Sequence, residues 1–514
     1  MLAKALSASV FGIDAYIVEV EVDLTRGVPA FTTVGLPDAA VKESEHRVQA
    51  AIKNSGFTFP LRRITVNLAP ADIKKEGPSF DLPIAVGILA AAGEIKNNLL
   101  NKFLILGELS LDGTLRPVKG VISMALGCRN KDFQGMIVPF ANAKEAAIVD
   151  SVPVFPVKNL VEVIRFFNNL GTIEPAKADL EEIFKDVSEY SVDFSEVKGQ
   201  EHAKRALEVA VAGGHNILMI GPPGSGKTML ARRLPTILPK MELDEALETT
   251  KIHSVSGHLP ADQPLVGTRP FRSPHHSTSE ASLIGGGSFA KPGEVSIAHN
   301  GILFLDELPE FHRDSLESLR QPVEDGFVTI GRAKMTLSYP ARFMLAASMN
   351  PCPCGFYSDP NHECRCTPNQ IMKYRTKISG PLLDRIDIHI EVPALKYDEL
   401  ARKEPGEPSA TIRERVNKTR QVQLERFKAM KRKKPIFCNG QMESKEIKKF
   451  CEISEECAKL LKTAIDRLGL SARAYDRIIK VSRTIADLEG VENIKPSHIS
   501  EAIQYRSLDR NVWT

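Results

Sequence analysis

The sequence lacks the features that mark secreted and membrane-bound chains. It has no charged-then-apolar leader ending in small residues, and no apolar run long enough to span a bilayer. Its net charge is only +3 over 514 residues, which by itself does not indicate a nucleic-acid partner. It has neither a solenoid-type repeat nor a low-complexity tract. We therefore expect a cytoplasmic globular protein of two to four domains, without a membrane partner.

Cysteine is scarce and unevenly placed. Four of the eight cysteines fall between positions 352 and 366, which argues against a disulfide framework in so long a chain. Cys352 and Cys354 are separated from Cys364 and Cys366 by a loop of nine residues rich in turn formers. Four thiolates gathered in this way suit a closed, tetrahedral and structural Zn²⁺ site. A reduced loop without metal is the alternative, and His362 could replace one ligand.

What the sequence does contain is a phosphate-binding loop. The segment 221–228 reads Gly-Pro-Pro-Gly-Ser-Gly-Lys-Thr, follows the apolar run 217–220 and precedes a helical pattern. Strand, glycine-rich loop and helix in this order let backbone N–H groups wrap a triphosphate. Lys227 can reach the outer phosphates, and the hydroxyl of Thr228 can ligate Mg²⁺. The residues expected to bind ATP are Gly221, Pro222, Pro223, Gly224, Ser225, Gly226, Lys227 and Thr228.

A second motif completes a nucleotide site. The apolar strand 301–305 ends in two carboxylates, Asp306 and Glu307. We expect Asp306 to hold Mg²⁺ with Thr228, and Glu307 to orient and deprotonate the attacking water. Lys227 and Asp306 are 79 positions apart, more than a minimal strand–helix–strand layout needs, so a segment is inserted between them. The two motifs together predict an ATP hydrolase with ATP and Mg²⁺ as cofactors.

Further segments resemble AAA+ ATPases. The stretch 193–200 resembles the entry segment that packs near the adenine, and Asn350, at the end of an apolar strand, matches the polar sensor residue. Arg385 resembles the arginine finger that acts in trans, and Arg473 resembles the second sensor. For each arginine a surface ion pair is the alternative. The catalytic residues that this resemblance implies are Lys227, Glu307, Asn350, Arg385 and Arg473. An arginine acting in trans implies a ring, usually a hexamer.

The front of the chain resembles a different family. Residues 1–170 alternate strand and helix patterns, and the stretches 75–81 and 107–118 resemble the proteolytic domain of Lon-type proteases, a ribosomal S5 domain 2-like fold. Ser79 occupies the position of the nucleophile, but Ile122 stands where the general-base lysine should be. The resemblance implies a Lon-like domain that has lost catalysis, with Ser79 as a helix cap. Residual peptidase activity is the alternative.

The remaining motifs point to one branch of the AAA+ proteins. The segments that resemble the magnesium-chelatase-like ATPases are 267–277, 283–287, 319–326, the predicted hairpin 326–338, and 470–477. Together with the Lon-like front half, they resemble the bacterial ComM (YifB) family along essentially the whole chain. This resemblance implies a hexameric, ATP-driven DNA motor or helicase. It would promote branch migration during natural transformation, on single-stranded or branched DNA and with recombination proteins as further partners.

Basic residues suggest where DNA would bind. By analogy with the family, the insert and hairpin line a channel in which Arg332 and Lys334 grip phosphates; solvated turn residues are the alternative. The run 413–434 holds ten basic and two acidic residues, so it could bind the nucleic-acid backbone or be a solvated lid helix. His275 and His276 are expected to be structural. The rival functions are a magnesium-chelatase motor subunit and an AAA+ protein remodeller or peptidase.

The expected fold class is α/β, in three parts joined by a linker. Residues 1–170 form the Lon-protease-like domain, and the charged stretch 171–192 is the linker. Residues 193–395 form the AAA+ P-loop core, with its insert, hairpin and four-cysteine loop. Residues 396–514 read as helices and form a helical lid.

Overall fold

A computed structural model describes most of the chain. It leaves out residues 73–74, 76, 97–98, 130–131, 180–189, 261–262, 288–289, 333–334, 358, 360–361, 395–405, 431–434, 470, 507 and 509–514. The chain divides into two compact units, Met1–Val187 with Leu243–Gly267, and Ser188–Glu242 with Thr268–Thr514. Within the described ranges, none of the helices combines the length and the apolar character that a bilayer crossing needs.

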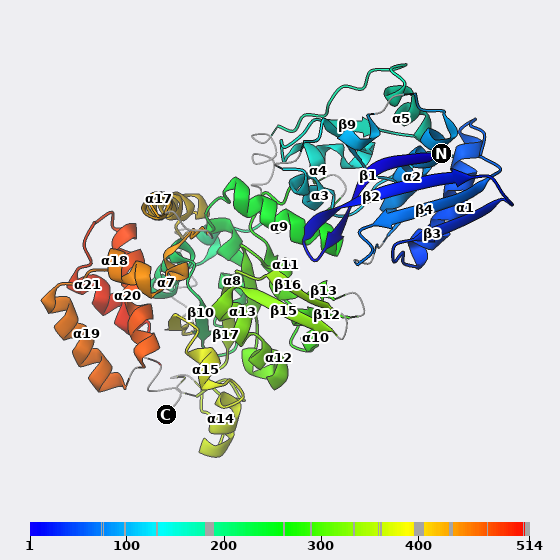
Figure 1. Cartoon of the computed structure of the whole chain (residues 1–514). Coiled ribbons are helices and arrows are strands. Elements are labelled where there is room, and N and C mark those ends of the chain that lie inside the picture. Colours follow the sequence, from blue (N-terminus) through cyan, green and yellow to red (C-terminus); the bar gives the residue numbers. More distant parts are fainter. Residues whose placement is uncertain are drawn as a thin grey trace. The chain divides into compact units, whose positions relative to one another are not determined.

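The first unit is an α/β fold built on a seven-stranded sheet in the order β3-β4-β2-β1-β5-β8-β9. β2 pairs antiparallel with β1 and β4, and the other neighbours in the sheet are parallel. α2 is buried almost all round and packs on β1 and β2 (Figure 1). The strands and helices of this unit are β1 (Leu2–Phe11), β2 (Asp14–Thr25), β3 (Ala30–Val34), α1 (Ala39–Asn54), β4 (Arg63–Ala69), α2 (Asp81–Ala92), β5 (Phe103–Ile105), β6 (Glu108–Leu109), β7 (Leu115–Arg116), α3 (Val121–Gly127), β8 (Gly135–Pro139), α4 (Ala143–Ala147), β9 (Val154–Val157), α5 (Leu160–Phe167) and α9 (Leu243–Ser256).

Sequence patterns locate most of these elements, because apolar residues alternate along the strands and recur every three to four positions along the helices. The alternation over 16–22 is the half-buried strand β2, with Val18, Val20 and Val22 inward, and the helix expected from 38 begins at the N-cap Asp38. The prediction for Ser79 is wrong. It lies inside a short 3-10 turn, η1 (Pro78–Phe80), and α2 begins behind it with no side-chain cap. The Ser79 side chain is buried in this turn.

A segment from the middle of the chain also belongs to the first unit. α9 packs against α3, and the Ser254 hydroxyl donates to Glu145 Oε1 at 2.7 Å and accepts from the Gly120 N–H at 3.0 Å. Burial raises the pKa of Glu145, whose oxygens also accept from Asn142 Nδ2. The inserted stretch expected between Lys227 and Asp306 therefore lies partly in this unit, although the expected core range 193–395 includes it.

The second unit holds a five-stranded parallel sheet in the order β11-β14-β17-β10-β18. Its strands are β10 (Ile217–Ile220), β11 (Phe271–Arg272), β14 (Ile302–Leu305), β17 (Met344–Met349) and β18 (Ile388–Glu391). β10, β14 and β17 are buried along their whole length, as expected of parallel strands covered on both faces. Because all five strands run the same way, their carboxyl ends meet at one edge, where open α/β sheets bind ligands.

Helices and small hairpins surround this sheet. The predicted hairpin is confirmed: β15 and β16 pair antiparallel from Phe327↔Pro340 to Arg332↔Met335. The surrounding elements are α7 (Glu201–Gly213), α8 (Lys227–Ile237), α10 (Glu280–Ile284), β12 (Gly285–Gly286), β13 (Lys291–Pro292), α11 (Glu294–Ile297), α12 (Arg313–Ser318), α13 (Arg320–Asp325), β15 (Phe327–Arg332), β16 (Met335–Pro340), α14 (Pro368–Arg375) and α15 (Gly380–Leu383).

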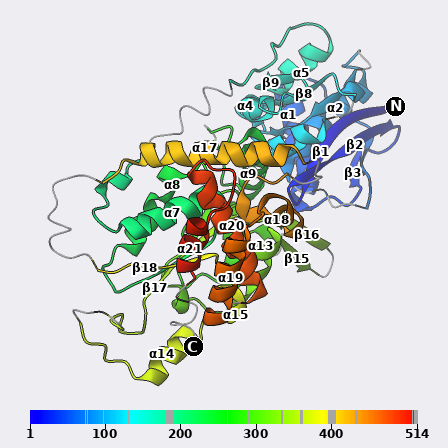
Figure 2. The ribbon, with the colours of Figure 1, turned by 90° about the vertical axis from the view of Figure 1, so that its left-hand side faces the viewer.

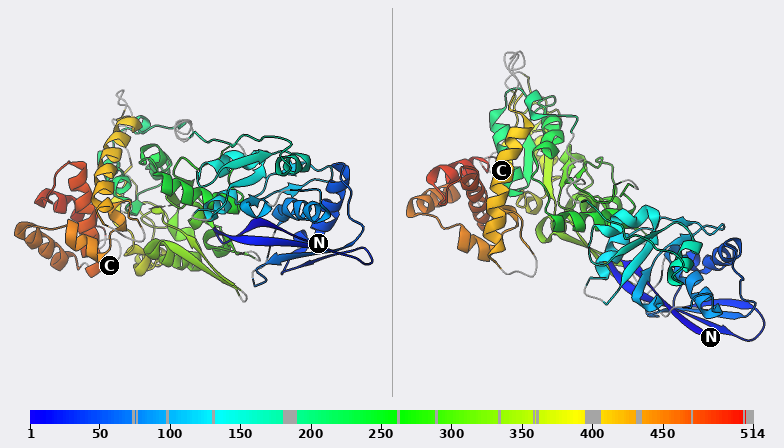
Figure 3. Two further views of the ribbon diagram at one scale, coloured as in Figure 1. Left: turned by 45° about the horizontal axis from the view of Figure 1, so that its top comes forward. Right: turned by 90° about the horizontal axis from the view of Figure 1, so that it is seen from above.

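The C-terminal part of the second unit is helical, as predicted. α17 (Ser409–Lys428) contacts α7, α8 and α20, and it runs along the boundary between the sheet-containing core and the last helices (Figures 2 and 3). The others are α18 (Ser444–Phe450), α19 (Glu455–Leu468), α20 (Ala472–Leu488) and α21 (Pro496–Gln504). The short helix expected at 398–403 lies outside the described residues.

Candidate functional site

The glycine-rich loop connects strand β10, which lies between β17 and β18, to α8 at the carboxyl edge of the sheet. The glycines of this loop are required by geometry, and two of them show why. Gly226 has φ +87, a left-handed conformation that side chains disfavour, and a Cβ on Gly221 would lie 2.1 Å from the Val392 carbonyl oxygen. The loop therefore packs tightly on the chain after β18. The order of strand, glycine-rich loop and helix is the one that the sequence predicts, and the binding of phosphate by the loop stays a prediction.

Lys227 lies buried at the start of α8. Its Nζ donates to the carbonyl oxygens of Gly221 at 2.8 Å and Pro222 at 2.9 Å, and to Asn350 Oδ1 at 3.2 Å. Burial lowers its pKa to about 8, against the opposing effect of the carboxylates Asp306 and Glu307. The ammonium group is therefore held inside the loop by neutral oxygens, which a phosphate group would outcompete.

The two expected magnesium ligands are in contact. Thr228 Oγ1 donates to Asp306 Oδ2 at 2.6 Å, although the two residues come from α8 and from the end of β14. The other oxygen of Asp306 accepts from the Ser348 hydroxyl on β17. A hydroxyl and a fixed carboxylate beside a phosphate loop are the oxygen ligands that Mg²⁺ takes in nucleotide sites, so Thr228 and Asp306 fit this metal.

Glu307 occupies the position after Asp306 and points more toward solvent. Its backbone has φ +53, and its side chain is 57% exposed. Its side chain lies near the ring of His276, whose Nδ1 is 3.7 Å from Glu307 Oε2. Sequence reasoning placed His276 among structural residues, and its position beside the expected catalytic base could not be read from the local pattern. The ring of His275 lies 4.0 Å from that of His276, and its Nδ1 is 2.8 Å from the Ser277 hydroxyl.

Gln200 is a second residue that sequence reasoning did not single out. It lies at the end of the stretch 193–200, and its Nε2 donates to the carbonyl oxygens of Ser225 at 2.8 Å and Pro393 at 3.2 Å. Its Oε1 is buried and has no hydrogen-bond partner among the described residues. The resemblance to an AAA+ entry segment pointed to this region, and the structure shows that the segment contacts the phosphate loop through Gln200.

The structure brings the two expected arginines together, at a site of their own. Arg385 is buried, and it donates to Glu324 on α13 and to the Pro381 carbonyl at 2.6 Å. Burial, and then the charge of Arg473, lowers the pKa of Arg385. Arg473 is more exposed and lies 3.9 Å from the same Glu324. Within the described residues, neither arginine forms a hydrogen bond or an ion pair with the phosphate loop of this chain, so their catalytic roles stay predictions.

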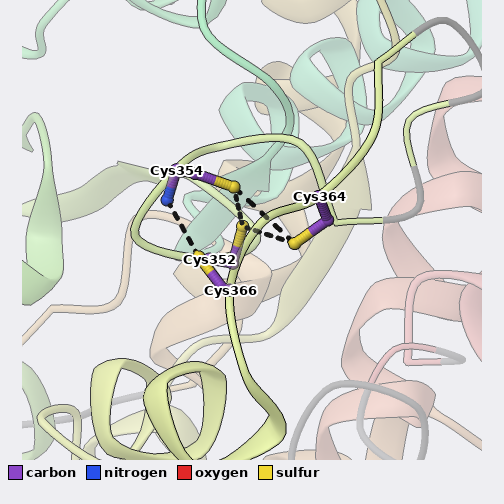
Figure 4. Close-up of side chains that lie close together, drawn as sticks. All are labelled: Cys352, Cys354, Cys364 and Cys366. Atoms are coloured by element: carbon purple, nitrogen blue, oxygen red, sulfur yellow. Dashed lines mark hydrogen bonds between the residues drawn. The ribbon is translucent and has the colours of Figure 1, made fainter.

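The four cysteines form one cluster. Figure 4 shows their sulfur atoms gathered from both ends of the loop, with Cys352 Sγ 3.4 Å from Cys354 Sγ and 3.7 Å from Cys364 Sγ. All four sulfurs lie within 4.8 Å of one another, and none forms a disulfide. Backbone N–H groups, first that of Phe356, lower the pKa of Cys354 to about 6. His362 is not a member of the cluster; its ring stacks on Phe356.

The predicted DNA contacts have different outcomes. Lys334 lies outside the described residues, and the backbone of Arg332 is described as the end of β15. In the basic run 413–434, three arginines of α17 have structural partners. Arg415 pairs with Glu208 at 2.6 Å, Arg426 with Asp487, and Arg420 is buried against backbone carbonyls of α7. This part of the run therefore stabilises helix packing, and residues 431–434 are not described.

Comparison with known proteins agrees with this geometry. Three family models match: magnesium chelatase subunit ChlI over residues 193–400, subunit ChlI of Mg-chelatase over 20–142, and the magnesium chelatase subunit ChlI C-terminal region over 406–506. The chain is 46% identical to the competence protein ComM of Haemophilus influenzae over 512 residues, which is 99% of this chain and 98% of that protein. The chain belongs to the ComM (YifB) family of magnesium-chelatase-like AAA+ proteins.

The other relatives differ in how much of this chain they cover. This ComM-family chain is 43% identical over 513 residues to an uncharacterised protein YifB of Salmonella typhimurium, covering 99% of this chain and 98% of that protein. The magnesium-chelatase subunit ChlI of Porphyra purpurea is 25% identical over 232 residues, only 40% of this chain. The likeness to ComM and YifB therefore includes the front half of the chain. The family is one of AAA+ ATPases, whose cofactors are ATP and Mg²⁺.

The buried position of Lys227 predicts a pH dependence of nucleotide binding. Only the charged lysine attracts the outer phosphates, and its pKa of about 8 means that it loses its proton above that pH. We expect ATP affinity to be constant from pH 7 to near 8 and then to fall by about tenfold per pH unit. Titration with a fluorescent ATP analogue would measure this. Lys227→Arg, which stays charged, should remove the fall, and a flat wild-type profile up to pH 9.5 would contradict the prediction.

Proposed function

We propose that this ComM-family chain is an ATP-driven DNA motor that promotes branch migration in recombination during natural transformation. The observation that carries the proposal is the likeness, along the full length, to a protein named for competence. The contact between the expected Mg²⁺ ligands Thr228 and Asp306 supports a nucleotide site. Lys227 would bind the outer phosphates, Thr228 and Asp306 would hold Mg²⁺, and Glu307 would take the proton of the attacking water. Asn350, already 3.2 Å from Lys227, would sense the γ-phosphate.

The motor would work as a ring, by analogy a hexamer. In the single chain Arg385 is held by Glu324, so it can complete a neighbour's site only after it leaves this carboxylate. Arg473 shares the same partner and is exposed enough to move with the lid helices. Nucleotide binding at the seam between two subunits would supply the phosphate charge that draws the arginines away. We propose a cytoplasmic ring that acts on single-stranded or branched DNA.

Two rival functions make different demands. A chelatase motor subunit would need a porphyrin-binding partner, and the likeness to ChlI of Porphyra purpurea covers only 40% of the chain. A peptidase would need an activated Ser79. Ser79 is buried in a 3-10 turn, and position 122, where the family's base lysine should stand, is a buried isoleucine. Both features favour the motor over its rivals.

The decisive test is ATP turnover with and without DNA. We expect branched or single-stranded DNA to raise the rate of phosphate release several-fold over the DNA-free rate, because a DNA motor hydrolyses ATP fastest when DNA is bound. Duplex DNA of equal length is the comparison. Stimulation only by a porphyrin-binding protein would favour the chelatase. Casein cleavage that is lost in Ser79→Ala would favour the peptidase.

The hairpin tip can be tested by measuring DNA binding at several salt concentrations. Replacing Arg332 and Lys334 together by alanine should weaken DNA binding and reduce the salt slope of log K by about two, one unit per phosphate contact. The matched control replaces Lys459 and Lys462, exposed on α19, and changes the net charge equally. If the tip variant keeps the wild-type affinity and slope, the hairpin does not grip DNA.

We also propose that the cysteine cluster holds a structural Zn²⁺. With Zn–S bonds of about 2.3 Å, a tetrahedral site has sulfur–sulfur edges of about 3.8 Å. The observed separations of 3.4, 3.6 and 3.7 Å are close to this value. The N–H of Cys354 donates to Cys366 Sγ at 3.4 Å, as expected for a thiolate ligand. Four sulfur ligands leave no open position, so the metal would stabilise the loop and take no part in hydrolysis.

Metal analysis checks this assignment. The purified protein is expected to contain about one zinc per chain, because the cluster supplies one complete set of four ligands. The double variant Cys364→Ser and Cys366→Ser should lose the metal, while Cys128→Ala, at a cysteine of the first unit, should keep it. Mass spectrometry of the metal after desalting gives the ratio. A protein that binds no zinc when refolded with an excess of it would contradict the site.

A further inference from the structure

The described part of the cysteine-containing segment 351–366, here the Cys knob, contacts the phosphate loop through Gly355. We infer that the Cys knob braces this loop, so that zinc held by the four cysteines and nucleotide held by the loop stabilise each other. The inference rests on the nucleotide site of the proposed function. It adds a regulatory role for the metal site, because a chain that loses zinc would bind ATP more weakly.

The contact between the two segments is close. Gly355 follows Cys354 directly, and a Cβ on Gly355 would lie 2.5 Å from Cδ and 2.6 Å from Cγ of Pro223 in the phosphate loop. Its φ of +89 and the N–H bond of Gly355 to the Cys352 carbonyl at 3.0 Å are parts of the same turn. The turn that carries two of the cysteines therefore presses its backbone onto the proline ring, with no room for a side chain between them.

The start of the Cys knob is tied to the same site. Asn350 immediately precedes it, and its Oδ1 accepts from Lys227 Nζ at 3.2 Å. The next residue, Pro351, accepts from Arg375 Nε at 3.2 Å through its carbonyl oxygen. Arg375 ends α14, which begins just after Cys366, and its guanidinium lies over the Tyr357 ring at 5.0 Å. Both ends of the Cys knob are thus held together beside the nucleotide site.

The Cys knob buries few of its own residues. Among its described residues, only Cys352 and Gly355 are buried. A segment without an apolar core of its own depends on cross-links or metal for its order. One of its two buried residues is a proposed zinc ligand, and the other is the residue that touches Pro223. Zinc bound to the segment would therefore also restrict the motion of the phosphate loop, through the contact between Gly355 and Pro223.

Thermodynamic coupling makes the effect reciprocal. If zinc orders the segment that braces the loop, zinc raises nucleotide affinity, and bound nucleotide must then raise zinc affinity by the same factor. This second direction can be measured without any hydrolysis. The same measurement distinguishes an energetic coupling from simple proximity. If the Cys knob only lay near the phosphate loop, nucleotide would leave the rate of zinc release unchanged.

The experiment measures zinc release from the full-length protein. A zinc-selective chelator is added to the zinc-loaded chain with and without a non-hydrolysable ATP analogue and excess Mg²⁺. We expect the analogue to slow zinc release at least threefold, and zinc removal to weaken binding of the analogue by a similar factor. Binding of the analogue to the zinc-loaded chain is measured first, in the same buffer.

Two proline variants locate the coupling. Pro223→Ala removes the ring atoms that touch Gly355 and should abolish the protection while the zinc content stays at one per chain. Pro353→Ala makes the same change at an exposed proline of the Cys knob that is neither a zinc ligand nor part of the phosphate loop, and should keep the protection. Loss of protection in both variants would overturn the proposed contact.

The remaining outcomes are equally distinct. Equal zinc release with and without analogue, in a chain that binds the analogue, overturns this inference and leaves the proposed function standing. Failure of the zinc-loaded chain to bind any nucleotide contradicts the proposed function and this inference with it. Inability of the folded chain to take up zinc overturns the inference and the proposed zinc site together, and leaves the proposed DNA motor standing.

Discussion

Lys227→Ala is expected to abolish ATP turnover, with a fall of at least about 100-fold, the scale on which loss of one preorganised cationic or hydrogen-bonding group slows an enzyme. Two effects act together. The outer phosphates lose their cation, and the carbonyl oxygens of Gly221 and Pro222 lose the buried ammonium that they accept from. The second effect should loosen the empty loop as well, so nucleotide affinity is expected to fall along with the rate.

The measurement is phosphate release together with binding of a fluorescent ATP analogue. Lys204→Ala is the matched control. Lys204 is as buried as Lys227, belongs to the same unit, and pairs with Glu201 on α7. The control should keep its turnover, and thermal unfolding should show that both variants fold. If Lys227→Ala keeps half or more of the wild-type rate in a preparation free of other ATPases, the site assignment fails.

The parts of the site that the sequence predicted are those whose chemistry is local. The loop 221–228 needs glycine where φ is positive or the backbone is close, a lysine, and a hydroxyl, all within eight positions. The strand before Asp306 is apolar because it is buried on both faces. The helices of the C-terminal part follow the 3.6-residue period, and α20 has the predicted bounds 472–488.

The parts that sequence reasoning missed depend on contacts between distant segments. His276 reaches Glu307, and Glu324 joins Arg385 to Arg473, through packing that no local pattern records. The ion pairs of Arg415 and Arg426 show the same limit. A run of basic residues has the same composition whether it faces DNA or carboxylates of its own chain, so charge counting could not separate the two.

The place of segment 243–267 could not be predicted for a related reason. The spacing of Lys227 and Asp306 predicts an inserted segment here. Neither the helix α9 nor its partners Glu145 and Gly120, more than a hundred residues earlier in the chain, could be read from that spacing. Ser79 is a similar case. A serine before an apolar helix is a common N-cap, and here the chain adds a 3-10 turn that moves the helix start past it.

Glu307→Gln should separate hydrolysis from binding, which Lys227→Ala cannot do. Glutamine has nearly the same shape as glutamate but cannot accept the proton of the attacking water, so we expect the hydrolysis rate to fall at least 100-fold, the low end of what general-base catalysis contributes. Binding should survive, because the expected Mg²⁺ ligands Thr228 and Asp306 keep their contact at 2.6 Å. The variant would then accumulate with ATP bound.

Single-turnover hydrolysis, analogue binding and light scattering with ATP together measure this outcome. Glu310→Gln, at an exposed carboxylate three residues later that pairs with Lys377, is the matched control and should hydrolyse ATP normally.

Asp306→Asn is the informative contrast, since it removes a metal ligand that also accepts from Ser348 and should lower binding and hydrolysis together. If Glu307→Gln behaves like Asp306→Asn, Glu307 helps to build the site. If it hydrolyses ATP at the wild-type rate, another group takes the proton, and His276, 3.7 Å away, becomes the residue to replace next.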